Sequence, residues 1–125
     1  MIASTKSLVA SGLLAASAIA FAVASPTVAA PNFDGEWSVV IMTQMGDCDA
    51  ALRYPIRISN GMLVNAGPMP VDITGRVVSN GAVTVRVTFG LKSASGTGRL
   101  ARMTGSGSWT GGDCKGVWTA QRRSS

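Results

Sequence analysis

The chain has 125 residues, with two cysteines and no histidine. The lack of histidine excludes Ser-His-Asp and Cys-His nucleophiles and nearly all zinc chemistry. Eleven Lys and Arg residues against six Asp and Glu give a net charge of +5 at pH 7, which becomes +4 if the segment holding Lys6 is removed. Because this positive charge is mild and dispersed along the chain, it does not predict binding to nucleic acid.

The first thirty residues have the pattern of a secretory signal peptide. One cation, Lys6, precedes the apolar run LVASGLLAASAIAFAVA, and small residues follow it. Cleavage after Ala24 or Ala29 suits the small residues that such a leader requires. The run is shorter than the roughly 20 residues of a spanning helix. We therefore predict a signal peptide over 1–30, cleaved near 24–30, and a periplasmic or extracellular protein without a membrane span.

The remaining residues, 31–125, form one domain by size. A domain this small has a modest core and often needs a covalent cross-link. Cys48 and Cys114 are the two cysteines of the chain, and in an oxidising compartment an even pair predicts one disulfide.

Apolar and polar residues alternate with period two along nearly all of this domain, which predicts strands. In AVTVRVTFG the apolar residues Val83, Val85, Val87 and Phe89 share one face. Turn signals separate such runs about every ten residues, and the Asn60-Gly61 and Asn80-Gly81 pairs favour tight hairpins. The predicted strands are roughly 35–43, 51–59, 62–66, 70–79, 82–90, 93–101, 103–110 and 114–122.

The connections between these strands are too short for parallel crossovers, so the sheet should be an antiparallel meander. Eight strands can remove their free edges by closing into a barrel, and a two-sheet sandwich is the alternative. In a meander, the loops after the first and seventh strands lie at one end. Closure therefore brings Cys48 close to Cys114, whereas an open sheet would separate them. We predict an all-β, eight-stranded up-and-down barrel with one disulfide.

All three tryptophans follow a glycine by two residues, and two of them lie in the last predicted hairpin. If 112–113 form a two-residue turn, Trp109 lies opposite Gly116 and Trp118 lies opposite Gly107. An indole that covers a bare glycine offsets the weakness of glycine in a strand.

The first strand could repeat this packing against the last, with Trp37 over Gly116 and Gly35 under Trp118. The three motifs would then seal the barrel at its seam. The alternative is an aromatic face that stacks on carbohydrate or nucleobases, in which the glycines have no role.

The Gly35-Glu36-Trp37 motif in the first strand, with Arg122 and Arg123 at the end of the last strand, resembles the structural signature of the calycins. This superfamily includes lipocalins, avidins and small bacterial metalloprotease inhibitors. The resemblance implies a barrel in which a basic residue of the last strand covers the first-strand tryptophan, so we expect Trp37 and Arg122 to meet as cation–π partners.

The segments FDGEWSV, GDCDAALRYPIRISNG and GSGSWTGGDCKGVWTAQRR also resemble small uncharacterised secreted proteins of alphaproteobacteria. That resemblance covers nearly the whole domain, but it implies no function.

Small residues occupy the inward face of the sixth and seventh strands, namely Ala94, Gly96, Gly98, Gly105 and Gly107. They either let tryptophan and phenylalanine fill the barrel or leave a small pocket. Side chains often fill eight-stranded barrels, and we expect a filled barrel here.

The disulfide should fix the pole with the longer loops, which is where function tends to lie. This loop pole would gather Asp47, Asp49 and Asp113, with Lys115 beside them. The three carboxylates offer the oxygen ligands that calcium takes. Turn formation explains the same residues without a metal, and we favour it, so we expect neither a metal nor a cofactor.

The arginines that alternate with apolar residues should point outward and keep the barrel soluble. We therefore expect an exported, monomeric, non-enzymatic barrel whose loop pole binds a small ligand, a protein or an envelope component. The alternatives are an inhibitor of proteases and a structural or adhesive envelope protein. An enzyme using the three aspartates is the reading least favoured, because the sequence shows neither a nucleophile nor a catalytic motif.

Overall fold

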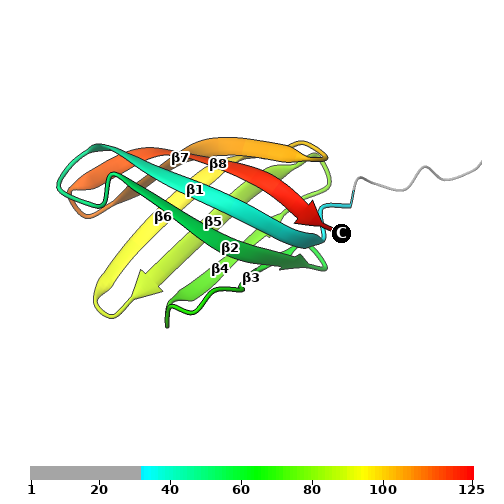
Figure 1. The fold of residues 1–125 in the computed structure, drawn as a ribbon, viewed down its shortest axis with the longest axis horizontal. Helices are drawn as coiled ribbons and strands as arrows, with labels where there is room; N and C mark the ends of the chain where they lie inside the picture. The colour runs from blue at the N-terminus through cyan, green and yellow to red at the C-terminus, as the bar shows by residue number, and fades with distance from the viewer. Residues whose placement is uncertain (1–31) are drawn as a thin grey trace, which may run out of the picture.

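The computed structural model describes residues 32–125, which form eight antiparallel strands closed into a barrel (Figure 1). The predicted signal peptide lies outside the described residues. The strands are β1 (Gly35–Met45), β2 (Ala51–Ser59), β3 (Met62–Asn65), β4 (Asp72–Val77), β5 (Ala82–Phe89), β6 (Lys92–Leu100), β7 (Thr104–Gly111) and β8 (Cys114–Ser124). The predicted fold class is confirmed, with strand ends displaced by at most two residues.

Closure depends on β1, which pairs with β2 on one side and with β8 on the other. Each remaining strand pairs with its neighbours in chain order, so the sandwich alternative is excluded. The weakest junction lies between β3 and β4, where the register contains the single pair Met62 and Arg76. Every other junction has at least four such pairs.

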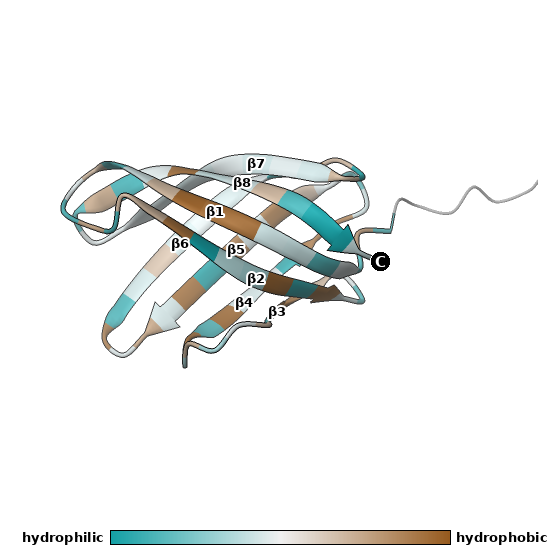
Figure 2. Cartoon of the chain, in the orientation of Figure 1, coloured by the Kyte–Doolittle hydropathy of each residue, from teal (hydrophilic) through white to brown (hydrophobic). Residues whose placement is uncertain are grey.

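Strand alternation separates an apolar interior from a polar exterior, and Figure 2 shows it along β5 as bands of brown and teal. Arg86, for example, is exposed between the partly buried Val85 and Val87. The buried apolar cluster lies toward the end of the barrel where β1 begins and β8 ends. It consists of Phe33, Trp37, Ile58, Val77, Val83, Leu100, Trp118 and Ala120.

The last hairpin has the predicted register, with Gly107 opposite Trp118 and Trp109 opposite Gly116. Trp118 packs on glycine as expected, because a Cβ on Gly107 would stand 2.6 Å from the indole of Trp118. The atoms nearest to Gly116 instead belong to the backbone of Met42. The first strand therefore approaches Gly116 so closely that no indole is needed to cover it.

The predicted pairing of the first strand with the last is wrong. Trp37 lies opposite Arg122 and not Gly116, and Trp118 lies opposite Ile41 and not Gly35. Closing a barrel requires tilted strands and a staggered register, so residues at equal height in a flat sheet do not pair. Shifts between Glu36 and Trp37 and between Thr43 and Met45 add to this stagger.

Cys48 and Cys114 form the predicted disulfide, with their Cα atoms 6.2 Å apart. The bond joins the loop after β1 to the start of β8. It therefore ties the closing pair of strands at the loop pole, and it is consistent with an oxidising compartment.

The disulfide should contribute substantially to stability, because its cysteines are 66 residues apart in sequence. Replacing both Cys48 and Cys114 with alanine should lower the free energy of unfolding by about 2–4 kcal/mol, since the unfolded chain regains its freedom. Urea unfolding of the two proteins measures this. Reduced wild-type protein is the control and should match the variant. A loss below about 1 kcal/mol would contradict this role of the cross-link.

The contact of Trp118 with glycine predicts a strong response to a single methyl group. A Cβ at position 107 would lie 2.0 Å from the carbonyl oxygen of Thr97 as well as against Trp118. Gly107→Ala should therefore destabilise the barrel by about 3 kcal/mol or more, whereas the exposed neighbour Ser106→Ala should change stability by less than about 0.5 kcal/mol. Thermal unfolding compares them, and equal effects of the two changes would argue against tight packing at this glycine.

Candidate functional site

The barrel encloses an apolar cavity of about 200 Å³ whose wall includes residues from all eight strands. The expectation of a filled barrel is therefore wrong. Ala94 and Gly96 line one side and leave room that larger side chains would occupy. The remaining lining residues that carry apolar side chains are Trp37, Val39, Ile41, Ile56, Ile58, Leu63, Ile73, Val77, Val83, Val85, Val87, Leu100, Trp109, Trp118 and Ala120.

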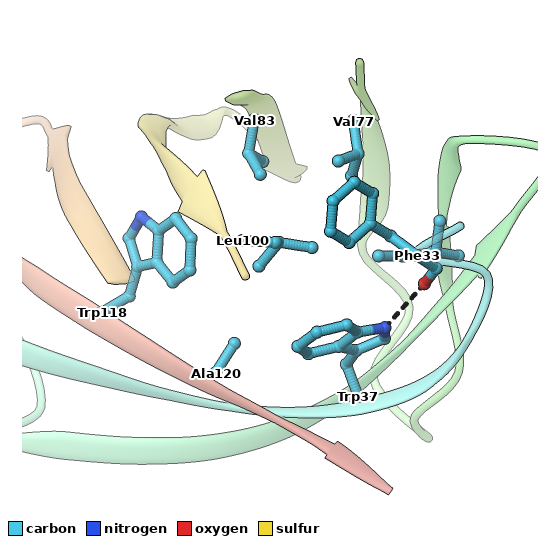
Figure 3. Close-up of a cluster of buried hydrophobic side chains, with 8 residues drawn as sticks. Phe33, Trp37, Val77, Val83, Leu100, Trp118 and Ala120 are labelled. Atoms are coloured by element: carbon cyan, nitrogen blue, oxygen red, sulfur yellow. Dashed lines mark hydrogen bonds between the residues drawn. The ribbon is translucent and has the colours of Figure 1, made fainter. Parts of the chain in front are cut away.

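Three indoles line this cavity, and each donates its N–H to a backbone carbonyl. Trp37 donates to Phe33 at 2.8 Å, as Figure 3 shows. Trp109 donates to Met42 at 3.2 Å, and Trp118 donates to Thr97 at 3.2 Å. The indoles therefore offer carbon surface to the cavity and no free donor. These inward positions also exclude an exposed aromatic stacking face built from the tryptophans.

Ser95 is the single residue with a polar side chain among those lining the cavity, and its hydroxyl accepts a hydrogen bond from the exposed Arg86 at 3.2 Å. No lining residue carries a titratable side chain. The wall can therefore exclude water and contact carbon, but it cannot transfer a proton. This chemistry suits an apolar guest, because an unpaired polar group in such a site would lose its hydrogen bonds to water.

The end of the barrel where β1 begins and β8 ends is closed by residues 32–34, directly before β1. Phe33 is buried in the core, with its ring beside Val77 and its carbonyl oxygen facing Trp37 (Figure 3). The carboxylate of Asp34 accepts hydrogen bonds from the backbone N–H groups of Asn60 and Gly61, at 2.8 and 3.0 Å. We call this end the closed pole.

Arg122 fastens this segment to the barrel. Its guanidinium lies 5.4 Å from the ring centre of Trp37, which confirms the predicted contact. The same group donates to the carbonyl oxygens of Arg102 at 3.0 Å, of Asn32 at 3.1 Å, and of Asp34. One side chain thus covers the most buried tryptophan and holds the residues that carry Phe33.

At the loop pole the wall of the cavity is less buried. Val83 is 5% exposed, whereas Val85 and Val87, further toward the loop pole on the same strand, are only partly buried. Trp109 and Ile41 are also only partly buried. The cavity therefore opens toward the loops that the disulfide ties.

The predicted loop-pole residues Asp47, Asp49, Asp113 and Lys115 are all exposed beside the disulfide. In the part of the chain that the structure describes, no three acidic, cysteine or histidine side chains lie where they could hold a metal ion. The structure therefore does not gather the three carboxylates into a calcium site. The order of this loop comes instead from backbone acceptors, such as the carbonyl of Asp49, which accepts from the Thr43 hydroxyl at 2.6 Å.

A polar cluster that the sequence did not reveal fills the gap where β3 and β4 separate. The hydroxyl of Tyr54 donates to the side-chain oxygen of Asn65 at 2.8 Å and accepts from the N–H of Met69 at 3.0 Å. Asn65 donates in turn to the carbonyls of Met69 and Val71. A buried tyrosine at an inward strand position is the one sequence signal for it, because a buried hydroxyl needs a partner.

Comparisons with protein-family models, with curated proteins and with solved structures found no significant match to this chain. The described residues contain no helix that is long and apolar enough to span a membrane.

The contacts of Arg122 predict that lysine cannot replace it. Arg122→Lys keeps the charge but loses the planar group that reaches three carbonyls, so the free energy of unfolding should fall by about 2 kcal/mol. Arg123→Lys is the matched control, because Arg123 is an exposed neighbour. Urea unfolding followed by tryptophan fluorescence measures both. Equal stability of the two variants would show that Arg122 does not fasten the closed pole.

Proposed function

We propose that this protein is an exported, non-enzymatic binding protein that holds a small apolar molecule inside the barrel. The observation that carries the proposal is a cavity whose lining has no titratable side chain and whose indole donors are all taken by the backbone. The guest would enter at the loop pole, where the Cys48–Cys114 disulfide holds the rim.

The volume of the cavity defines the size of the guest. An apolar cavity of about 150 Å³ in another protein stays dry and binds benzene. A cavity of about 200 Å³ therefore suits one aromatic ring with a short substituent, or a short branched alkyl group. Drug-sized ligands usually occupy about 300–1,000 Å³, so a larger molecule would leave part of itself outside the mouth.

The closed pole counts against the analogy with protease inhibitors. An inhibitor that presents its N-terminal segment needs that segment free. Here Phe33 is buried, and Asn32 and Asp34 are held by Arg122. The residues directly before β1 thus serve to close the barrel.

Native mass spectrometry of protein recovered gently from the envelope of the producing organism tests the proposal. We expect a measured mass greater than that of the disulfide-bonded chain, and the additional mass should be released as a small apolar molecule. Ala94→Leu should abolish this excess, because the larger side chain enters the cavity. Thr84→Leu is the control, because Thr84 is exposed on the outer face, and it should retain the bound molecule.

A second readout keeps the test independent of the natural ligand. Toluene should raise the melting temperature of the wild-type protein and of Thr84→Leu, but not that of Ala94→Leu. The proposal would be overturned if protein recovered from the envelope carries no bound molecule and toluene does not raise its melting temperature.

A further inference from the structure

The apolar surface of the cavity continues out of the barrel along β5. Val83 is 5% exposed, Val85 and Val87 are partly buried, and Phe89 is 53% exposed. Leu91, at the tip of the turn that follows, is fully exposed. The solvent exposure of the inward-facing side chains of β5 therefore increases from the core to the loop pole, and none of these side chains is polar.

The tip of the β5–β6 hairpin exposes an apolar side chain. Gly90 has a φ of +61° and supplies the conformation that the turn needs, but the next residue is leucine. With Gly90 in the first position, the second position of the turn does not need a positive φ, so the backbone does not dictate which residue stands there, and the side chain of Leu91 is fully exposed. Met69, in the connection between β3 and β4, is also 38% exposed at the same pole. We call Met69, Phe89 and Leu91 the apolar lip.

Charged side chains stand around the mouth on both sides. Lys92 pairs with Phe89, so a cation stands at the apolar lip. The carboxylates of Asp47, Asp49 and Asp113 lie in the loops of β1, β2, β7 and β8, on the other side of the closed barrel. Figure 1 shows the β5–β6 turn well apart from those two loops. Charges of both signs therefore surround the mouth: Asp72, which pairs with Thr88, stands beside the apolar lip together with Lys92, and the exposed Lys115 lies near the aspartates on the other side.

We propose that the apolar lip docks on a phospholipid bilayer and that the cavity exchanges its guest with the hydrocarbon layer there. This inference rests on the proposed function. An apolar guest that binds in the cavity also partitions into lipid. If the mouth of the cavity lies at the bilayer surface, the guest can move between the two without being exposed to water. Leu91 and Phe89 would enter the acyl boundary, and Lys92 would reach the headgroup phosphates.

Flotation with phosphatidylcholine vesicles tests the docking directly, using the whole exported chain with its disulfide intact. Wild-type protein should float with the vesicles, and Leu91→Ser should lower the vesicle partition constant by about tenfold, because one exposed leucine no longer enters lipid. Leu91 is fully exposed at a turn, so this change should leave the melting temperature intact. Met62→Ser is the matched control, because Met62 is 49% exposed on β3 away from the lip, and it should bind like wild type.

Further measurements distinguish this proposal from its alternatives. Binding should persist at about 0.5 M salt, since it depends on apolar contact; binding that salt abolishes would overturn the proposal in favour of the outward arginines. Self-association that Leu91→Ser removes, without any flotation of the wild type, would show that the lip meets a second copy. Ala94→Leu should still float although it has lost the guest. Flotation of that variant with no guest in the wild type would retain the docking and reject the cavity function.

Discussion

The structure depends on the pairing of β1 with β8, because this junction turns a meander of strands into a barrel. The pairing places Arg122 opposite Trp37 at one end and brings Cys48 to Cys114 at the other. Both ends of the seam are thus fastened, one by a side-chain clamp and one by a covalent bond. Closure also creates the interior, since an open sheet of this length would have one apolar face and no cavity.

Glycine and tryptophan together determine the shape of that interior. Glycines of β6 and β7 let the indole of Trp118 lie flat against the backbone, where a Cβ on Gly98 or Gly107 would clash with it. The ring then stays against the wall, and its N–H is anchored to Thr97. Large residues can therefore line a small barrel without filling it. The sequence alone suggests the opposite, because three tryptophans have ample volume to occupy the centre.

Features that depend on local chemistry could be predicted from the sequence. Period-two alternation and the Asn-Gly turns located the strands, and counting loop ends placed the two cysteines at one pole. The register of β1 against β8 could not be predicted, because it follows from strand tilt and from shifts near Trp37 and Thr43 that have no local signal. The cavity was the alternative that the sequence did not favour, and the cluster of Tyr54 with Asn65 was missed, for a related reason. Both depend on which side chains meet across the barrel after closure.

The two poles differ in how their backbone groups and apolar side chains are satisfied. At the closed pole, Asp34 caps the Asn60-Gly61 turn and Phe33 completes the core, so the chain itself supplies what an open barrel end lacks. At the loop pole, no described segment plays that part for Phe89 and Leu91, which stay exposed. In the proposed docking, these side chains continue the apolar wall of the cavity into the bilayer, so the lipid would cover at the loop pole what Phe33 covers at the closed pole.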